Sequence, residues 1–127
     1  MTYMEIPILK IHDTLIVSIQ VDLSDELVLL LQQNLLQQIS QTEARGLLID
    51  LTAVEIVDSF MSRILTETAH MAQIMGTNVA LVGIQPAVAM TMVELGVYFK
   101  NIPTCRNLEK GLDYLAAIQT PERGVST

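Results

Sequence analysis

The chain has 127 residues, a hydrophobic fraction of 50% and a net charge of −7, which fits one domain with a buried core. The acidic charge argues against binding to nucleic acid or to an acidic membrane surface. No apolar run approaches the roughly 20 residues that span a bilayer, and the N-terminus does not resemble a secretory signal. A single cysteine, Cys105, favours a reducing compartment, so we expect a cytoplasmic protein.

The first elements are predicted to form a β-hairpin. Residues 6–11 and 14–21 are rich in β-forming side chains, and they flank His12 and Asp13, a pair that suits a turn. Pro7 has no backbone N–H to donate, so this strand is expected near an edge of the sheet.

A helix is predicted from Ser24 to about Thr42, because apolar side chains recur there at helical spacing and two acids follow its start. We expect Gly46 to end this helix. Residues 47–50 (LLID) then form a short continuous apolar run, which is typical of a strand buried on both faces of a parallel sheet.

The stretch 54–65 (VEIVDSFMSRIL) contains a change of pattern. β-Forming residues end at Asp58 and Ser59, and the apolar side chains that follow are spaced as in a helix. This stripe continues to Met75, and Gly76 suits the position after the helix end. The sequence therefore predicts a helix that begins at an acid and a hydroxyl.

The remaining elements continue the alternation of strands and helices. Residues 78–83 predict a buried strand, Pro86 begins a helix that Gly96 ends, a short strand lies near 102–104, and Asn107 caps a final helix. The order β-β-α-β-α-β-α-β-α predicts an α/β layered domain with a mixed sheet of about five strands and about four helices.

We expect a single domain over residues 1–119, and a polar tail over residues 120–127 that is disordered. Metal binding is not expected, because no two of the soft ligands His12, His70 and Cys105 lie at ligand spacing. The glycines do not cluster into a phosphate-binding loop either. The sequence therefore predicts no metal and no cofactor.

The pair at the strand–helix joint has several interpretations. Either side chain could cap the helix, a contribution of about 1 kcal/mol. Catalysis by Ser59 would require a base and an orienting group, and no G-x-S-x-G pattern supports it. Asp50 and Asp58 could form a carboxylate pair, although Asp50 at a strand end fits a structural role better. The role of Asp58 stays open.

The residues after the joint suggest a surface for a partner. Phe60 and Met61, together with the apolar segment GIQPAVAMTM further along the chain, could line one rim near Ser59. Methionine-rich surfaces adapt to partners. The spacing alone slightly favours the alternative, that these methionines fill the core of a Met-rich chain.

Three stretches carry a resemblance to a known family: IPILKIHDTLIVSIQ, GLLIDLTAVEIVDSFMSRIL and MGTNVALVGIQPAVAMTMVELG. Together they cover most of residues 5–96. The chain resembles the STAS family, the sulfate-transporter and anti-sigma-factor-antagonist domain, and within it the RsbS-type scaffold proteins of the bacterial stressosome. The segment after residue 96 is less diagnostic.

The resemblance implies a non-catalytic switch in stress signalling. It implies that an RsbT-type serine kinase phosphorylates Ser59, that this releases the kinase, and that a phosphatase resets the site. Asp58, Phe60 and Met61 would form the partner-binding rim. The implied partners are the kinase, RsbR-type STAS paralogues in a large mixed assembly, and other copies of this chain. RsbR-type proteins have a second phosphorylated threonine, and the corresponding loop here offers Pro86 in GIQPAVA, so one site is expected.

Two other functions remain to be separated from this one. A small-ligand or nucleotide-binding regulatory domain is the first alternative, since nucleotide binding has been proposed for some STAS domains. A serine hydrolase that uses Ser59 is a more distant alternative. The resemblance favours the scaffold over both.

Overall fold

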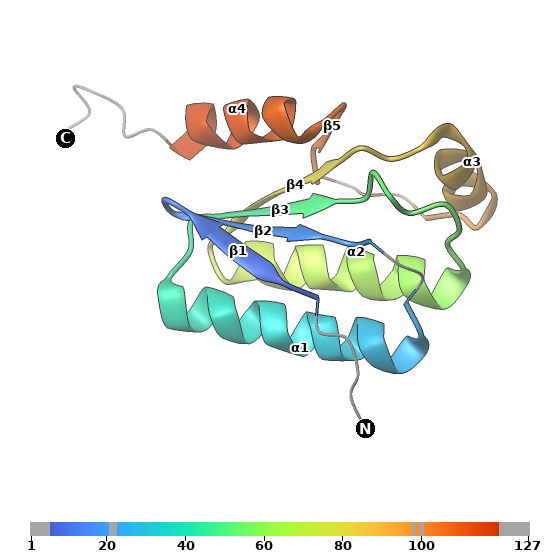
Figure 1. The fold of residues 1–127 in the computed structure, drawn as a ribbon, viewed down its shortest axis with the longest axis horizontal. Helices are drawn as coiled ribbons and strands as arrows, with labels where there is room; N and C mark the ends of the chain where they lie inside the picture. Colours follow the sequence, from blue (N-terminus) through green and yellow to red (C-terminus); the bar gives the residue numbers. More distant parts are fainter. Residues whose placement is uncertain (1–5, 21–22, 98, 100, 120–127) are drawn as a thin grey trace.

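The computed structural model describes residues 6–20, 23–97, 99 and 101–119. One β-sheet lies between two layers of helices, with α1 and α2 on one face and α4 on the other (Figure 1). In chain order the elements are β1 (Ile8–Ile11), β2 (Thr14–Ser18), α1 (Asp25–Thr42), β3 (Gly46–Asp50), α2 (Ser59–Ile74), β4 (Asn78–Val82), α3 (Pro86–Glu94), β5 (Thr104–Cys105) and α4 (Leu108–Gln119). The α/β fold class and the predicted order of elements are confirmed.

The sheet has the strand order β1-β2-β3-β4-β5. β1 pairs antiparallel with β2, and the other neighbouring strands pair parallel. The mixed sheet follows from the hairpin at the N-terminus and from the helices that connect the later strands, because a crossover through a helix returns the chain in the same direction. The predicted hairpin is therefore confirmed over the described residues; residues 21 and 22 lie outside them.

Helix boundaries agree with the capping signals at three of the predicted positions. Ser24 caps α1, Asp58 caps α2, and Asn107 accepts a hydrogen bond from Lys110 N–H in the first turn of α4. The prediction that Gly46 ends α1 is wrong. Glu43 takes the left-handed conformation there, with φ of 54°, and Gly46 is already the first residue of β3.

The core lies on both faces of the sheet. Alternate residues of β2, β3 and β4 point to the side of α1 and α2, and the others point to α4, so the middle residues of the central strands are apolar on both faces. Gly111 lets α4 approach closely, because a Cβ atom there would press against side-chain atoms of Val82 and Leu48. None of the helices within the described ranges is both long and apolar enough to cross a bilayer.

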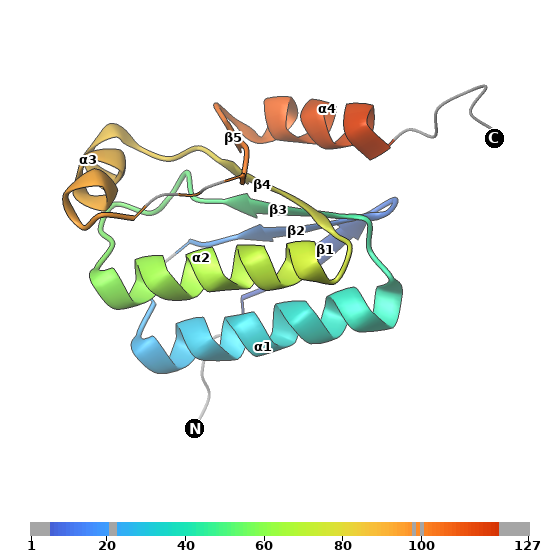
Figure 2. The ribbon, with the colours of Figure 1, turned by 180° about the vertical axis from the view of Figure 1, so that it is seen from behind.

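The parallel strands have their carboxyl ends at the same end of the molecule, and several connecting segments meet there. The segment 51–58 after β3, the first turn of α2 and all of α3 lie at the same end of the molecule in both views (Figures 1 and 2). In chains of this architecture, ligands and partners commonly meet loops at the carboxyl ends of the strands.

Candidate functional site

The start of α2 presents a serine hydroxyl to solvent. Ser59 is the first helical residue, and both it and Asp58 are exposed. Asp58 has extended backbone geometry, and its Oδ1 accepts a hydrogen bond of 2.8 Å from the backbone N–H of Met61. Capping is thus provided by the acid. Within the described part of the chain, no hydrogen bond occupies the Ser59 hydroxyl.

The segment before Ser59 is fixed by a polar network at the end of β3. Asp50 accepts hydrogen bonds from the backbone N–H of Thr52 (2.9 Å) and from its hydroxyl, and Ser18 on β2 donates to the other oxygen of Asp50 at 3.3 Å. Asp50 therefore has the structural role that its place at a strand end suggests: it holds the turn that leads to α2.

The same turn is joined to the start of α3. Gln85, the N-cap residue of α3, donates from Nε2 to the carbonyl oxygen of Thr52 at 2.7 Å. Gly83 has φ of 77°, and a Cβ atom there would collide with the Thr52 hydroxyl. The glycine is required both by its backbone conformation and by this close approach. The turn after β3 and the start of α3 are consequently held together.

Two valines attach the middle of this segment to the core. Val54 and Val57 are buried, whereas Ile56 between them is exposed. Because both neighbours are anchored, Ile56 is held outward. The two buried valines therefore hold Ser59 in place, although the segment before it has no regular secondary structure.

Phe60 and Met61, the two residues after Ser59, have different environments. Phe60 is half-buried, and the guanidinium of Arg63 lies 5.2 Å from the centre of its ring. Met61 is only 5% exposed and belongs to the main core. Direct contact with a partner is therefore available to Phe60, whereas Met61 supports the first turn from below.

Exposed apolar side chains lie on the segments at this end of the molecule. Ile56, Met90 and Val93 are 68%, 65% and 64% exposed, and we call these three residues the end surface. Met90 and Val93 belong to α3, the helix that Gln85 joins to the segment carrying Ile56. The sequence pointed to the Met-rich segment of α3 but not to Ile56, because no pattern distinguishes an outward residue between two anchored valines.

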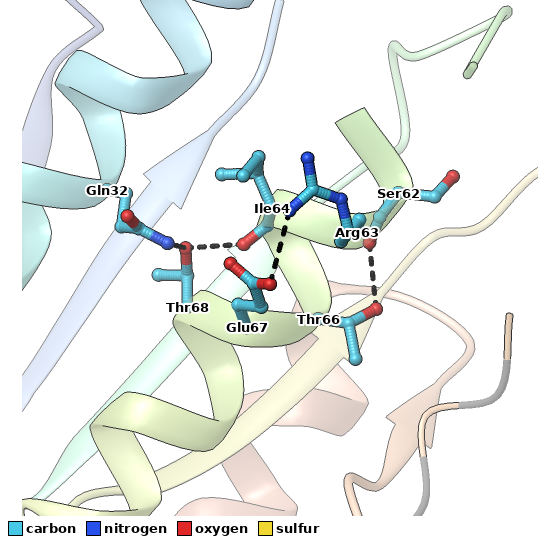
Figure 3. A network of polar contacts seen from close by, with 7 residues as sticks. All are labelled: Gln32, Ser62, Arg63, Ile64, Thr66, Glu67 and Thr68. Atoms are coloured by element: carbon cyan, nitrogen blue, oxygen red, sulfur yellow. Dashed lines mark hydrogen bonds and ion pairs between the residues drawn. The ribbon is translucent and has the colours of Figure 1, made fainter. Parts of the chain in front are cut away.

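Further along α2, polar side chains form the contacts drawn in Figure 3. Arg63 forms an ion pair with Glu67 at 3.4 Å, one turn away. Thr68 donates to the carbonyl oxygen of Ile64 at 2.6 Å and accepts from Gln32 of α1 at 3.0 Å, which connects the two long helices. Arg63 also stands one turn after Ser59, so this cation has an acid on one side and the serine on the other.

The described residues contain no group of three potential metal-ligating side chains. His12 lies in the β1–β2 turn, His70 in the second half of α2, and Cys105 on β5. These positions belong to separate elements of the fold.

Comparisons with known proteins agree with this geometry. The family model described as the STAS domain matches residues 5–111. A solved serine-to-glutamate variant of RsbS from Moorella thermoacetica is 38% identical, with a TM-score of 0.82, and the similarity covers 91% of this chain and 97% of that one. A chain in a structure of the stressosome, described as a signal integration and transduction hub, is also 38% identical, with a TM-score of 0.77 and coverage of 91% and 100%.

A curated relative is RsbRB of Bacillus subtilis strain 168, an RsbT co-antagonist protein. It is 32% identical over 93 residues, which are 73% of this chain and 34% of RsbRB. The related co-antagonist RsbRA of the same organism is 27% identical over 95 residues, again 34% of its length. The chain thus spans about a third of the length of the curated relatives that it matches.

Proposed function

Because the chain belongs to the STAS domain family, we propose that it is a non-catalytic stressosome scaffold that sequesters an RsbT-type serine kinase and releases it when Ser59 is phosphorylated. The observation that carries this proposal is the hydroxyl of Ser59, which is exposed at the start of α2 and does not cap the helix. The end surface lies at the same end of the molecule. Similarity to RsbS and to RsbT co-antagonist proteins supports the same role.

The surroundings of Ser59 suit a phosphate. A phosphoserine carries about −1.5 to −2 charges at pH 7, and the first turn of a helix offers backbone N–H groups and the positive end of the dipole. Asp58 opposes the new charge. Arg63, one turn along the helix, can leave Glu67 and pair with the phosphate instead, since residues four apart on a helix are neighbours. The modified domain therefore keeps its fold.

What changes is the surface offered to the kinase. The end surface is apolar, and its nearest charged neighbours along the chain, Glu55, Asp58 and Glu94, are acidic. A kinase that covers Ile56 and Met90 brings Ser59 close to its own site. Once phosphorylated, Ser59 adds about −1.5 to −2 charges to the docking area. Arg63 can neutralise only one of these charges, and the remaining interfacial charge without a partner is costly. Release then follows from electrostatics without unfolding.

The remaining partners follow from the relatives. RsbR-type STAS paralogues would join this chain in a large mixed assembly, as the similarity to a chain of a stressosome structure supports. A phosphatase would reset Ser59, and copies of the chain would associate with one another. All of these partners are compatible with a cytoplasmic assembly.

The test is phosphorylation with the cognate kinase and ATP, followed by mass spectrometry of the modified residue. Ser24 provides a matched control, because it is also an exposed serine at a helix start. We expect phosphate on Ser59 in the wild type and in Ser24→Ala, and none in Ser59→Ala. Phosphate on another residue, or its persistence in Ser59→Ala, would refute the proposed site.

A further inference from the structure

Ser62, at the end of the first turn of α2, has a hydroxyl that is buried without a hydrogen-bond partner. Its side chain is 0% exposed, and its Oγ has no donor or acceptor among the residues that the structure describes. Burial of a hydroxyl without such a partner is unfavourable, because the group loses the hydrogen bonds that water gives it. The folded state is therefore locally destabilised at this position.

Two other hydroxyls of α2 are paired. Thr66 donates to the carbonyl oxygen of Ser62 at 2.8 Å, and Thr68 donates to the carbonyl oxygen of Ile64 at 2.6 Å and accepts from Gln32. In Figure 3 dashed lines end at both threonine hydroxyls, whereas the line at Ser62 ends at its carbonyl oxygen. Each threonine uses the carbonyl group four residues earlier, a usual partner for a hydroxyl within a helix. The Ser62 hydroxyl does not form the corresponding bond.

The side chain of Ser62 belongs to an otherwise apolar stripe of α2. Leu65, Ala69 and Ala72 follow it at intervals of three and four residues, and each is 2% exposed or less and part of the main core. An alanine or a cysteine at this position would suit the stripe without adding an unpaired hydroxyl. Local exceptions of this kind are concentrated at functional sites.

Ser62 also closes the turn that carries Ser59. Its backbone N–H donates to the carbonyl oxygen of Asp58 at 3.0 Å. Val57 before this turn and Met61 within it are only 6% and 5% exposed. An enzyme that transfers a phosphoryl group has to position the acceptor and exclude water around it. While the turn is closed, the two buried neighbours limit how far a kinase can enclose Ser59.

Opening of this turn frees both neighbours, and it also brings the Ser62 hydroxyl into contact with water. The hydroxyl regains hydrogen bonds in the open state, so a serine makes the opening easier than an alanine would. We propose that Ser62 is a positioning residue for Ser59, whose unpaired hydroxyl lets the first turn of α2 open so that a kinase can enclose the acceptor. This inference rests on the proposed phosphorylation of Ser59. The open state is transient, so the modified domain keeps its fold.

The first test is amide hydrogen exchange of the full chain, which needs no kinase. In the wild type, we expect the amides of Met61 and Ser62 to exchange faster than those of Ala69 and Ala72. Ser62→Ala and Ser62→Cys should slow exchange at positions 61 and 62 about tenfold. The cysteine variant separates the effect of the hydroxyl from helix propensity, which is similar for serine and cysteine.

The control is Thr68→Val, which removes a hydroxyl of α2 that has partners. Because Gln32 and the carbonyl group of Ile64 lose their bonds to it, this variant should exchange faster in α2 than the wild type. Removal of a hydroxyl from α2 thus has opposite effects at positions 62 and 68.

The second test is the initial rate of Ser59 phosphorylation at a low concentration of the domain. A tenfold smaller open population should lower this rate about tenfold in Ser62→Ala, although the variant is more stable than the wild type. A role in stability alone predicts no such decrease.

Three results would overturn the proposal: amides of residues 61 and 62 as protected as that of Ala72, equal exchange in Ser62→Ala and the wild type, or equal phosphorylation rates. Equal phosphorylation rates would leave Ser59 as the modified residue. Absence of phosphate from Ser59 in the wild type would instead refute the proposed function, and the exchange measurements would still decide whether Ser62 opens the turn.

Discussion

The starts of α1 and α2 both carry an exposed serine, but they use it differently. Ser24 is the N-cap of α1, and its hydroxyl accepts a hydrogen bond from Leu27 N–H at 3.2 Å. At α2 the cap is Asp58, so Ser59 stands one residue further on and its hydroxyl is not used for capping. The comparison shows that an acid placed before a serine leaves the serine hydroxyl without a capping role while the helix stays capped.

The largest expected effect comes from Gly83, where the turn after β3 meets the start of α3. Gly83→Ala forces a left-handed residue with a side chain into Thr52, and we expect a loss of about 3 kcal/mol of unfolding free energy, measured by urea denaturation. Gly96→Ala is the control, because Gly96 has φ of 75° but nothing within 4 Å of the added Cβ. It should lose only about 1 kcal/mol. Equal losses would show that the contact with Thr52 is unimportant.

The next effect concerns the end surface. Met90→Glu replaces an apolar side chain of the end surface with a charged one. We expect the binding free energy of the kinase to weaken by about 2 kcal/mol. Binding can be measured by isothermal titration calorimetry. The control is Ile74→Glu at the other end of α2, where the side chain is 85% exposed. If both variants weaken binding equally, the kinase does not dock on the end surface.

Removal of the acid that caps α2 has a smaller effect. Asp58→Ala should cost about 1 kcal/mol of stability, because the Met61 N–H loses its acceptor. Asp58→Asn keeps an acceptor and should restore most of this stability, which thermal unfolding can measure. Unchanged stability in Asp58→Ala would contradict the division of roles between Asp58 and Ser59.

The smallest effect is expected at Arg63. Its exposed ion pair with Glu67 contributes about 0.3–0.5 kcal/mol, so Arg63→Gln should leave the unmodified protein almost unchanged. In the phosphorylated protein, Arg63→Gln should lower the melting temperature more, because the phosphate on Ser59 loses the guanidinium that pairs with it. Comparing the melting temperatures of both forms, with Glu67→Gln as the control, measures the difference. An identical effect in both forms would exclude the exchange of partners.

The sequence was sufficient for the order of elements and for the start of α2, because both depend on local signals. Hydrophobic spacing defined the strands and helices, and Asp58 followed by a helical stripe marked the joint. A glycine after a helix fits either a helix end or a strand start, so the pattern alone does not place Gly46, and the left-handed Glu43 ends α1 before it.

The end surface depends on tertiary contacts, which local patterns do not contain. Ile56 is outward because Val54 and Val57 are both buried, and α3 lies beside that segment because Gln85 bonds to Thr52. Met61 and Met90 have the same side chain, yet the first is in the core and the second faces solvent. Only the assembled fold separates these two methionines.

The most direct measurement is the affinity of the kinase for the same protein before and after phosphorylation of Ser59, with an amide NMR spectrum recorded for each form. We predict that binding weakens tenfold or more, and that amide shifts change only around the start of α2 and the end surface. Equal or tighter binding by the phosphorylated protein, or shift changes throughout the sheet, would contradict a charge switch on a fold that stays the same.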